Sequence, residues 1–181
     1  MPLATAPADT PDWLMQAWLT KKQRHELRRK LRRAESGAWG VTWRFVERGE
    51  DLAAATETFM SLMALDGHKA RFLTPAMRAQ FEALLRAAQS KGWLQLAFLE
   101  VEGKPAATYL NFDYNDRVLV YNSGLDPEYQ WLSPGWVLVA YLIRWAVEQG
   151  RKEFDFLRGD EDYKFRLGGV PRSIYRLTIR R

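Results

Sequence analysis

The 181-residue sequence contains no cysteine and only two histidines, His25 and His68. The absence of cysteine excludes disulfides, thiolate metal ligands and thiol nucleophiles. With so few imidazoles, a histidine-built metal centre or catalytic triad is not expected either, and we predict no metal cofactor. Any chemistry must therefore use other groups.

Long apolar runs are also missing. No stretch approaches the roughly 18 consecutive apolar residues of a membrane span, and the N-terminus lacks the charged start and apolar core of a signal peptide. We therefore expect a cytoplasmic protein without a membrane span. Apolar residues nevertheless make up 47% and aromatic residues 13% of the chain, which indicates a folded protein. The length predicts one domain.

Positive charge is concentrated in one segment. The net charge is +5, and residues 21–35 hold eight lysines or arginines against two glutamates, which leaves a net −1 for the rest. Thr20 as an N-cap, the Leu27 and Leu31 spacing and a stop at Gly37 predict a helix here. A tRNA contact through Lys21–Arg33 is one interpretation, and a solvated helix that once linked two domains is the other. We divide the chain into a tail (1–19), this basic helix (20–37) and one domain (38–181).

The remaining pattern predicts a mixed sheet with helices packed on it. Helices are expected at 51–65, 74–92 and 133–150, with a polar loop at 66–73 and a short helix near the end. Strands are expected at 41–46, 93–101, 105–112, 117–123, 153–157 and 173–179, and the three central ones form an antiparallel meander. The fold class is thus α/β (α+β), with a mostly antiparallel central sheet and helices on both faces.

The run Leu132-Ser133-Pro134-Gly135 precedes a helix that is apolar almost all round. We expect Ser133 to cap the helix and Pro134 to occupy its first position, which leaves the N–H groups of Gly135, Trp136 and Val137 free. Free donors and the helix dipole favour a phosphate or carboxylate. A well-capped buried helix is the alternative interpretation.

Two further loops carry candidate functional groups. Asp155 lies between two phenylalanines on a predicted strand, and Arg158 is the nearest cation in sequence to pair with it. Tyr163 and Lys164 follow, and a phenol beside an ammonium can bind an anionic substrate or stabilise an oxyanion. His68, in the predicted loop 66–73, is the only imidazole well placed to accept an amine proton.

Several motifs together resemble one protein family. They are Tyr121-Asn122-Ser123, Asp126-Pro127, Leu132-Ser133-Pro134-Gly135 and Asp155-Phe156-Leu157-Arg158-Gly159 followed by Tyr163-Lys164. From about Lys22 to the end, the chain resembles the C-terminal domain of the Fem-like and cellulose-biosynthesis-associated (CelD-like) group of the GNAT acyltransferase superfamily. In that superfamily the acyl-CoA pyrophosphate lies at the start of the helix after the fourth strand.

The resemblance implies an acyltransferase that moves an acyl group, such as acetyl, from acyl-CoA to an amine or hydroxyl, in cell-envelope or polysaccharide metabolism. It implies that the donor, acetyl-CoA or another acyl-CoA, contacts Leu132, Ser133, Pro134, Gly135, Trp136, Val137 and Arg158. The implied catalytic residues are Lys164, Tyr163, Tyr121 and His68, and the implied acceptor-binding residues are Asp66, Arg71 and Asp155.

Two features differ from the family pattern. Gln130-Trp131-Leu132-Ser133-Pro134-Gly135 replaces the usual Gln/Arg-x-x-Gly-x-Gly/Ala loop, and only one GNAT-sized unit is present where Fem-like proteins generally pair two. The first difference leaves open an aminoacyl-tRNA donor, as in Fem-like transferases. The second leaves open a partner second domain, a homodimer, or a non-catalytic interaction module.

Overall fold

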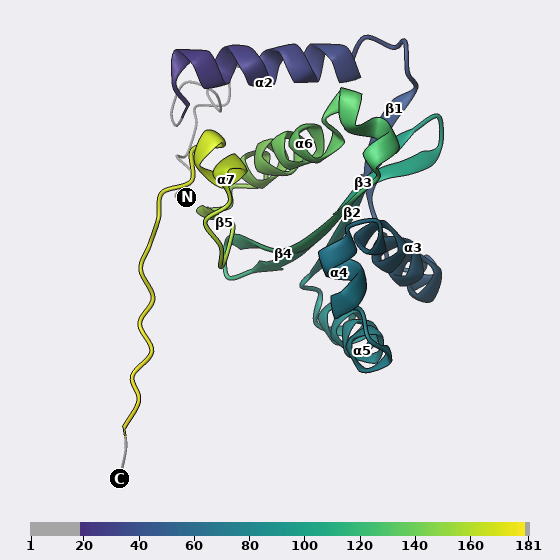
Figure 1. Cartoon of the computed structure of the whole chain (residues 1–181), viewed down its shortest axis with the longest axis vertical. Helices are drawn as coiled ribbons and strands as arrows, with labels where there is room; N and C mark the ends of the chain where they lie inside the picture. The colour runs from purple at the N-terminus through teal and green to yellow at the C-terminus, as the bar shows by residue number, and fades with distance from the viewer. Residues whose placement is uncertain (1–18, 180–181) are drawn as a thin grey trace.

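The computed structural model describes residues 19–179 (Figure 1). Its helices are α2 (Lys21–Ala34), α3 (Leu52–Ala64), α4 (Gly67–Phe72), α5 (Pro75–Lys91), the 3-10 helix η1 (Pro127–Leu132), α6 (Pro134–Glu148) and α7 (Asp162–Arg166). Its strands are β1 (Val41–Phe45), β2 (Leu94–Val101), β3 (Lys104–Tyr114), β4 (Arg117–Leu125) and β5 (Glu153–Asp155). Except for Leu19, the predicted tail 1–19 lies outside the described residues.

The five strands form one sheet in the order β1-β2-β3-β4-β5. Strands β1 to β4 pair antiparallel, and β5 pairs parallel with β4. Helices α2 and α6 lie on one side of the sheet, and α3, α4 and α5 lie on the other (Figure 1). The predicted mixed sheet with helices on both faces is therefore confirmed.

Helix α6 is the central helix of the fold. Leu138, Val139 and Leu142 are completely buried, because the sheet covers one side of the helix and α2 packs on another. Its nearly continuous apolar surface predicts this position, since a helix that is apolar all round must be covered on more than one side.

Local capping groups set the bounds of the other helices. Thr20 and Gln23 form a reciprocal capping box at the start of α2. Thr74 caps α5 ahead of Pro75, and Gly92 ends that helix in the left-handed conformation. These signals are present in the sequence, and the predicted helices agree with the observed ones within about two residues.

Two predicted elements are wrong. The stretch 66–73, expected as a polar loop, contains helix α4, because the Asp66 side chain accepts hydrogen bonds from the N–H groups of His68 and Lys69 and so caps a helical turn. The stretch 173–179, expected as the last strand, is not part of the sheet, and its apolar side chains are exposed. Strand propensity is insufficient without a neighbouring strand to pair with.

Strands β4 and β5 diverge after a short pairing. Only Arg117–Leu119 of β4 pairs with Glu153–Asp155 of β5, although β4 continues to Leu125. Tyr121 is the extra residue of a β-bulge, since Leu110 pairs with Asn122 and Asn111 pairs with Val120. Beyond Leu119, the β5 side of β4 is therefore open, and the bulge bends the strand at this opening.

Candidate functional site

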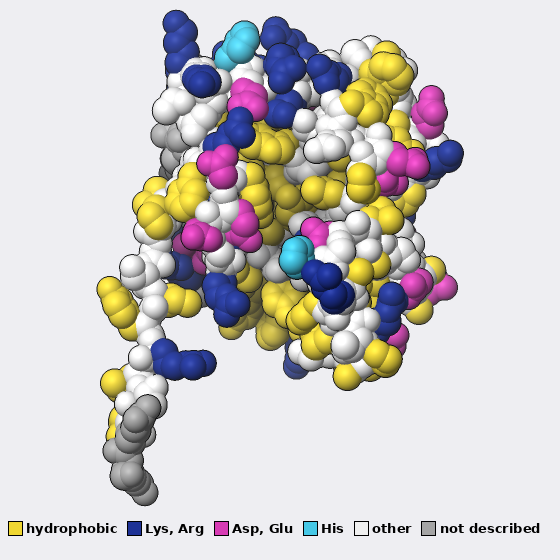
Figure 2. Space-filling model, viewed as in Figure 1, with side chains coloured by type: hydrophobic (Ala, Val, Ile, Leu, Met, Phe, Trp, Pro, Cys, Tyr) yellow, Lys and Arg dark blue, Asp and Glu magenta, His cyan; other side chains and the backbone are white. Residues whose placement is uncertain are grey.

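A hollow lies beside the open part of β4. Figure 2 shows the molecular surface hollowed between the α4 and α7 regions, with apolar side chains at its floor. One pocket here has a volume of about 550 Å³ and is bordered by the start of α4, the end of β4 and the start of α6. Of the predicted site residues, Asp66, Ser133, Pro134, Gly135 and Trp136 line it.

The start of α6 differs from the expected amide-lined phosphate site. Ser133 has a left-handed backbone, and its side chain makes no capping bond to α6, because its hydroxyl accepts a 2.7 Å hydrogen bond from Lys30 Nζ. The N–H groups of Trp136 and Val137 donate to the Ser133 carbonyl at 3.0 and 3.2 Å. The predicted serine cap is wrong, and so is the prediction that these two amides are free.

Gly135 is required for packing between α6 and β4. A Cβ atom at this position would lie 2.9 Å from Leu125 Cδ2, so the space expected for a ligand is occupied by a side chain. Leu132 and Val137 are 0% exposed and belong to the core, so their side chains do not reach the pocket. Of the residues predicted to contact the donor, only Ser133, Pro134, Gly135 and Trp136 face this pocket.

Lys69 is the residue that sequence reasoning missed. It is half-buried on α4, and its ammonium donates to the Ser123 carbonyl at 2.5 Å and to the Ser123 hydroxyl at 3.4 Å. Burial lowers its pKa from the ordinary value, although the Asp66 and Glu161 carboxylates act in the opposite direction. Reading Asp66 as an N-cap would have placed Lys69 on a helix, but its place beside the pocket depends on the contact with Ser123, 54 positions away.

Tyr121, His68 and Arg71 do not line this pocket. Tyr121 is partly exposed and packs against Phe81 and Phe112, with ring centroids 6.2 and 5.5 Å apart. His68 and Arg71 are exposed on α4, where the Arg71 guanidinium lies 3.0 Å from His68 Nδ1. Arginine can only donate, so Nδ1 is the acceptor in this contact. The catalytic and acceptor-binding roles of these three residues stay predictions.

Asp155, Arg158 and Lys164 border a second hollow of about 800 Å³ beside α7. The predicted pairing of Asp155 with Arg158 is wrong. Asp155 pairs with Arg172 at 3.0 Å and accepts the Leu157 N–H at 2.8 Å. Leu157 has a left-handed backbone with φ of 53°, so the chain turns sharply between Asp155 and Arg158.

Lys164 holds the loop before α7. Its side chain is only 9% exposed, and its ammonium contacts the Arg158 carbonyl and the Glu161 carboxylate, both at 2.8 Å. Burial acts to raise the pKa of Glu161, but the hydrogen bond from Lys164, a backbone hydrogen bond and the charges of Lys164 and Lys69 together hold that pKa below the ordinary value. The ammonium predicted to be catalytic is therefore engaged in positioning the loop.

Tyr163 lies next to this lysine in the sequence and is half-buried against Phe156, with ring centroids 6.0 Å apart. Burial raises the pKa of Tyr163 to about 12, and the Glu161 charge acts in the same direction. The phenol therefore keeps its proton at neutral pH and is a hydrogen-bond donor, not a base.

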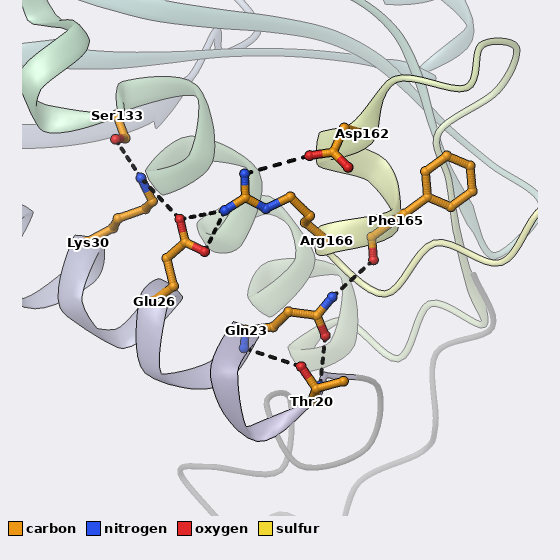
Figure 3. Close-up of polar contacts among 8 residues, drawn as sticks. All are labelled: Thr20, Gln23, Glu26, Lys30, Ser133, Asp162, Phe165 and Arg166. Atoms are coloured by element: carbon orange, nitrogen blue, oxygen red, sulfur yellow. Dashed lines mark hydrogen bonds and ion pairs between the residues drawn. The ribbon is translucent and has the colours of Figure 1, made fainter.

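Helix α2 is attached to α7 through side chains (Figure 3). The Glu26 carboxylate receives two bonds from the Arg166 guanidinium, at 2.6 and 2.8 Å, and Gln23 Nε2 donates to the Phe165 carbonyl at 3.4 Å. Leu27, on the inner face of α2, is buried. The helix is thus part of the domain, and the interpretation as a solvated linker is wrong for its inner face.

The same contacts reach the start of α6. Lys30 Nζ and the Arg166 guanidinium both lie near the Trp136 ring, at 5.3 and 5.0 Å from its centroid. Glu26 pairs with both cations, at 3.9 Å from Lys30 and 2.6 Å from Arg166. Because the cations are partly neutralised, this cluster mainly fixes α2, α6 and α7 relative to one another.

Replacing Glu161 by glutamine is expected to lower the free energy of unfolding by about 2 kcal/mol at pH 7. The change leaves the Lys164 ammonium buried without its carboxylate, but Glu161 is 57% exposed, so the cost is below that of a fully buried pair. The pKa of Glu161 is lower in the folded state than the ordinary value of 4.5. The stability that Glu161 contributes is therefore fully present above pH 4.5 and is lost as pH falls through the folded-state pKa.

Urea unfolding at pH 7 and pH 3 measures this effect. The parent and the Glu161→Gln variant should differ at pH 7 and converge at pH 3. The matched control is Glu82→Gln, whose partner Arg86 is 64% exposed and should contribute little. Equal losses in the two variants at pH 7 would contradict the role of the buried lysine.

The described residues contain no group of three or more histidine, aspartate or glutamate side chains arranged to hold a metal ion. Within residues 19–179, none of the helices has the length and apolar character needed to cross a bilayer.

Comparisons with known proteins fit this geometry. A family model described as an acetyltransferase (GNAT) domain matches residues 21–165. No curated protein matches the chain. A solved GCN5-related N-acetyltransferase from Ralstonia eutropha JMP134 is 19% identical with a TM-score of 0.58, over 77% of this chain and 99% of that one.

Two other solved structures resemble the chain at similar levels. The aminoglycoside acetyltransferase AAC(6')-Iy, in complex with a CoA-containing bisubstrate analogue, is 14% identical with a TM-score of 0.53, over 78% of this chain and 98% of that one. The C-terminal domain of a putative lysylphosphatidylglycerol synthetase from Agrobacterium fabrum is 16% identical with a TM-score of 0.53, over 78% of this chain and 42% of that one. At these identities the similarity concerns the fold.

Proposed function

The chain belongs to the acetyltransferase (GNAT) domain family, and from this premise we propose that it transfers an acyl group, acetyl in the simplest case, from acyl-CoA to the amine of an acceptor. The observation that carries the proposal is the opening between β4 and β5. The strands pair over three residues each and then separate, and the opening leads to the start of α6 and Lys69. The acyl arm of the donor lies along the open edge of β4 in this proposal.

The charges around the pocket support a phosphorylated donor. Lys69 lines the pocket, and Lys30 donates to the hydroxyl of Ser133, another lining residue. Since two of the first-turn amides are already bonded, Lys30 takes a larger part in holding the donor phosphates than the backbone does. The similar acetyltransferase that was solved with a CoA-containing analogue gives further support for this donor class.

In the reaction, a neutral amine attacks the thioester carbonyl, a C–N bond forms and the C–S bond breaks. The amine proton leaves to a base or water, and the CoA thiolate takes up a proton. The Lys69 ammonium stabilises the negative charge on the carbonyl oxygen in the transition state. Tyr163, which keeps its phenolic proton at neutral pH, is suited to protonate the leaving sulfur. Lys164 holds the loop before α7, the short helix that carries Tyr163.

The test is an assay of acetyl transfer from acetyl-CoA to a panel of amines, in which the release of the free CoA thiol is measured. The chain has no cysteine, so a thiol reagent detects the product without a background from the protein. Donor binding is measured separately by thermal unfolding, because a ligand that binds the folded state raises the unfolding temperature with its concentration. If acetyl-CoA does not stabilise the chain and no amine causes thiol release, the proposal is contradicted. Binding without transfer would reject the acceptors tested and retain the donor.

A second donor, aminoacyl-tRNA, is favoured by the outward face of α2. Lys21, Lys22, Arg29 and Arg32 are exposed there, whereas Lys30 faces inward to Ser133. Lysines and arginines on one exposed helix face bind phosphates of a nucleic acid with a strong dependence on salt. In this alternative the outer face holds the tRNA, and the acylated end reaches the same pocket.

The double change Arg29→Glu and Arg32→Glu is expected to weaken tRNA binding and to reduce the slope of log affinity against log salt by about one unit for each phosphate that the variant no longer neutralises. The matched control is Arg86→Glu with Lys91→Glu, two exposed residues of α5 on the opposite side of the sheet. Fluorescence anisotropy at several salt concentrations measures both. Equal losses in the two double variants would indicate a net-charge effect and reject the α2 site.

A further inference from the structure

We propose that Lys69 is a modification site, at which the chain acylates itself from acyl-CoA bound in the adjacent pocket when no acceptor amine is present. The inference rests on the proposed donor and goes beyond transfer to an acceptor. Because acylation turns the ammonium into a neutral amide, it also makes Lys69 a switch that stops transfer.

The position of Lys69 places an amine beside the donor. Among the described residues that line the 550 Å³ pocket, it is the only lysine. Its nitrogen lies 2.5 Å from the carbonyl oxygen of Ser123, on the part of β4 that no longer pairs with β5. A donor whose acyl arm lies along this open edge, as proposed above, brings its thioester close to the nitrogen. Two groups held together in this way react far faster than they do free in solution.

Its bonding separates Lys69 from the other enclosed lysines of the domain. Lys30 and Lys164 each pair with a glutamate, at 3.9 and 2.8 Å, so the loss of either proton would leave a carboxylate without its cation. Lys69 forms no ion pair within residues 19–179, and its two hydrogen bonds go to neutral groups of Ser123. A neutral amine therefore forms more readily at Lys69 than at the other two.

The charges around Lys69 leave the neutral amine favoured on balance. Burial lowers the pKa of Lys69, whereas the carboxylates of Asp66, at the start of α4, and Glu161, before α7, act in the opposite direction. Burial is the largest of these effects, so a larger fraction of Lys69 than of an exposed lysine is unprotonated near neutral pH. Only the unprotonated amine has the lone pair that attacks a carbonyl.

In the reaction, the Lys69 nitrogen attacks the thioester carbonyl carbon, a C–N bond forms and the C–S bond breaks. The nitrogen gives one proton to water and the CoA thiolate takes one up, so the products are an N-acyl lysine and free CoA. A neutral amine has two hydrogens, so it keeps a hydrogen bond to the Ser123 carbonyl while its lone pair attacks. The amide product is stable and does not pass its acyl group to an acceptor.

The first test incubates the full chain with acetyl-CoA in the absence of an acceptor and follows each lysine by peptide mass spectrometry. We expect acetylation of Lys69 at least about tenfold faster than that of Lys91, an exposed lysine of α5. The rate at Lys69 should saturate with donor concentration and be independent of chain concentration, because the reaction occurs within one complex. At Lys91 the rate should rise in proportion to the donor. Equal rates at the two lysines would overturn the proposal.

Thermal unfolding with acetyl-CoA, measured on the same preparation, separates this inference from the proposed function. Stabilisation together with saturable acetylation of Lys69 supports both. Stabilisation without acetylation of Lys69 would overturn the modification site and retain the donor. The absence of both stabilisation and acetylation would overturn the donor and the modification site together.

The second test examines the switch with Lys69→Arg, which keeps a cation but has no amine that loses its proton near neutral pH. The parent and the variant are incubated with acetyl-CoA, freed of donor and then assayed for acetyl transfer. We expect the parent to lose activity in proportion to the acetylated fraction of Lys69, and the variant to keep whatever activity it had before incubation. An equal loss in the two proteins, or full activity of acetylated parent, would overturn the switch.

Discussion

Replacing Gly124 by alanine is expected to lower the free energy of unfolding by about 3 kcal/mol. A Cβ atom at this position would lie 2.6 Å from both the carbonyl carbon of Leu62 and the amide nitrogen of Met63, and 2.8 Å from Leu62 Cβ. The first two are backbone atoms of α3, which cannot rotate away as a side chain would. The whole helix must therefore shift from β4, and the buried residues Phe59 and Met63 lose packing.

The same shift is expected to disturb the candidate site. Helix α3 continues into α4 through Asp66, and Lys69 of α4 bonds to Ser123, the residue before Gly124. Urea unfolding measures the loss of stability. The control is Gly67→Ala, where nothing lies within 4 Å of the added Cβ and the backbone φ is not positive. A loss in the free energy of unfolding below about 1 kcal/mol for Gly124→Ala would contradict this prediction, because α3 could then move away from β4 at little cost.

The sequence predicts those parts of the fold that depend on local signals. The apolar surface of α6, the Thr74-Pro75 helix start and the three-strand meander are all confirmed, because capping, periodicity and turn chemistry act over a few residues. Helix α4 was missed because its six residues are polar for the most part, and only the Asp66 cap distinguishes them from a loop. The segment 173–179 has the composition of a strand, but no residue pattern shows whether a neighbouring edge receives it.

The sequence places the candidate site at the start of α6, where a pocket lies, but it does not predict the contacts there. The start of α6 borders the pocket as expected, but the bond from Lys30 to Ser133 joins residues 103 positions apart and removes the predicted cap. The same limit applies to Asp155, whose partner is Arg172 and not the nearer Arg158. Lys69 was missed because its contact with Ser123 spans 54 positions. Such pairs are set by the packing of the sheet and not by spacing along the chain.

Replacing Lys69 by methionine is expected to lower kcat/KM for acetyl transfer about 100-fold, which corresponds to about 2.7 kcal/mol of transition-state stabilisation. Among the described residues that line the 550 Å³ pocket, Lys69 is the only lysine or arginine. Methionine keeps the length of the side chain and removes its charge, so the change tests the ammonium and not the packing. A role at the transition state lowers kcat, whereas a role in holding phosphates alone raises KM.

The pH profile provides a readout that a purely structural lysine would not change. Burial lowers the pKa of Lys69, so activity that requires its ammonium should decline, as pH rises, at a lower pH than the ordinary value of 10.5 would give. This alkaline decline should be absent from the residual activity of Lys69→Met and retained in the control Lys91→Met, an exposed lysine on α5. Circular dichroism confirms that both variants fold. A change in kcat/KM below about threefold, with the alkaline decline intact, would show that the cation in the pocket takes no part in transfer.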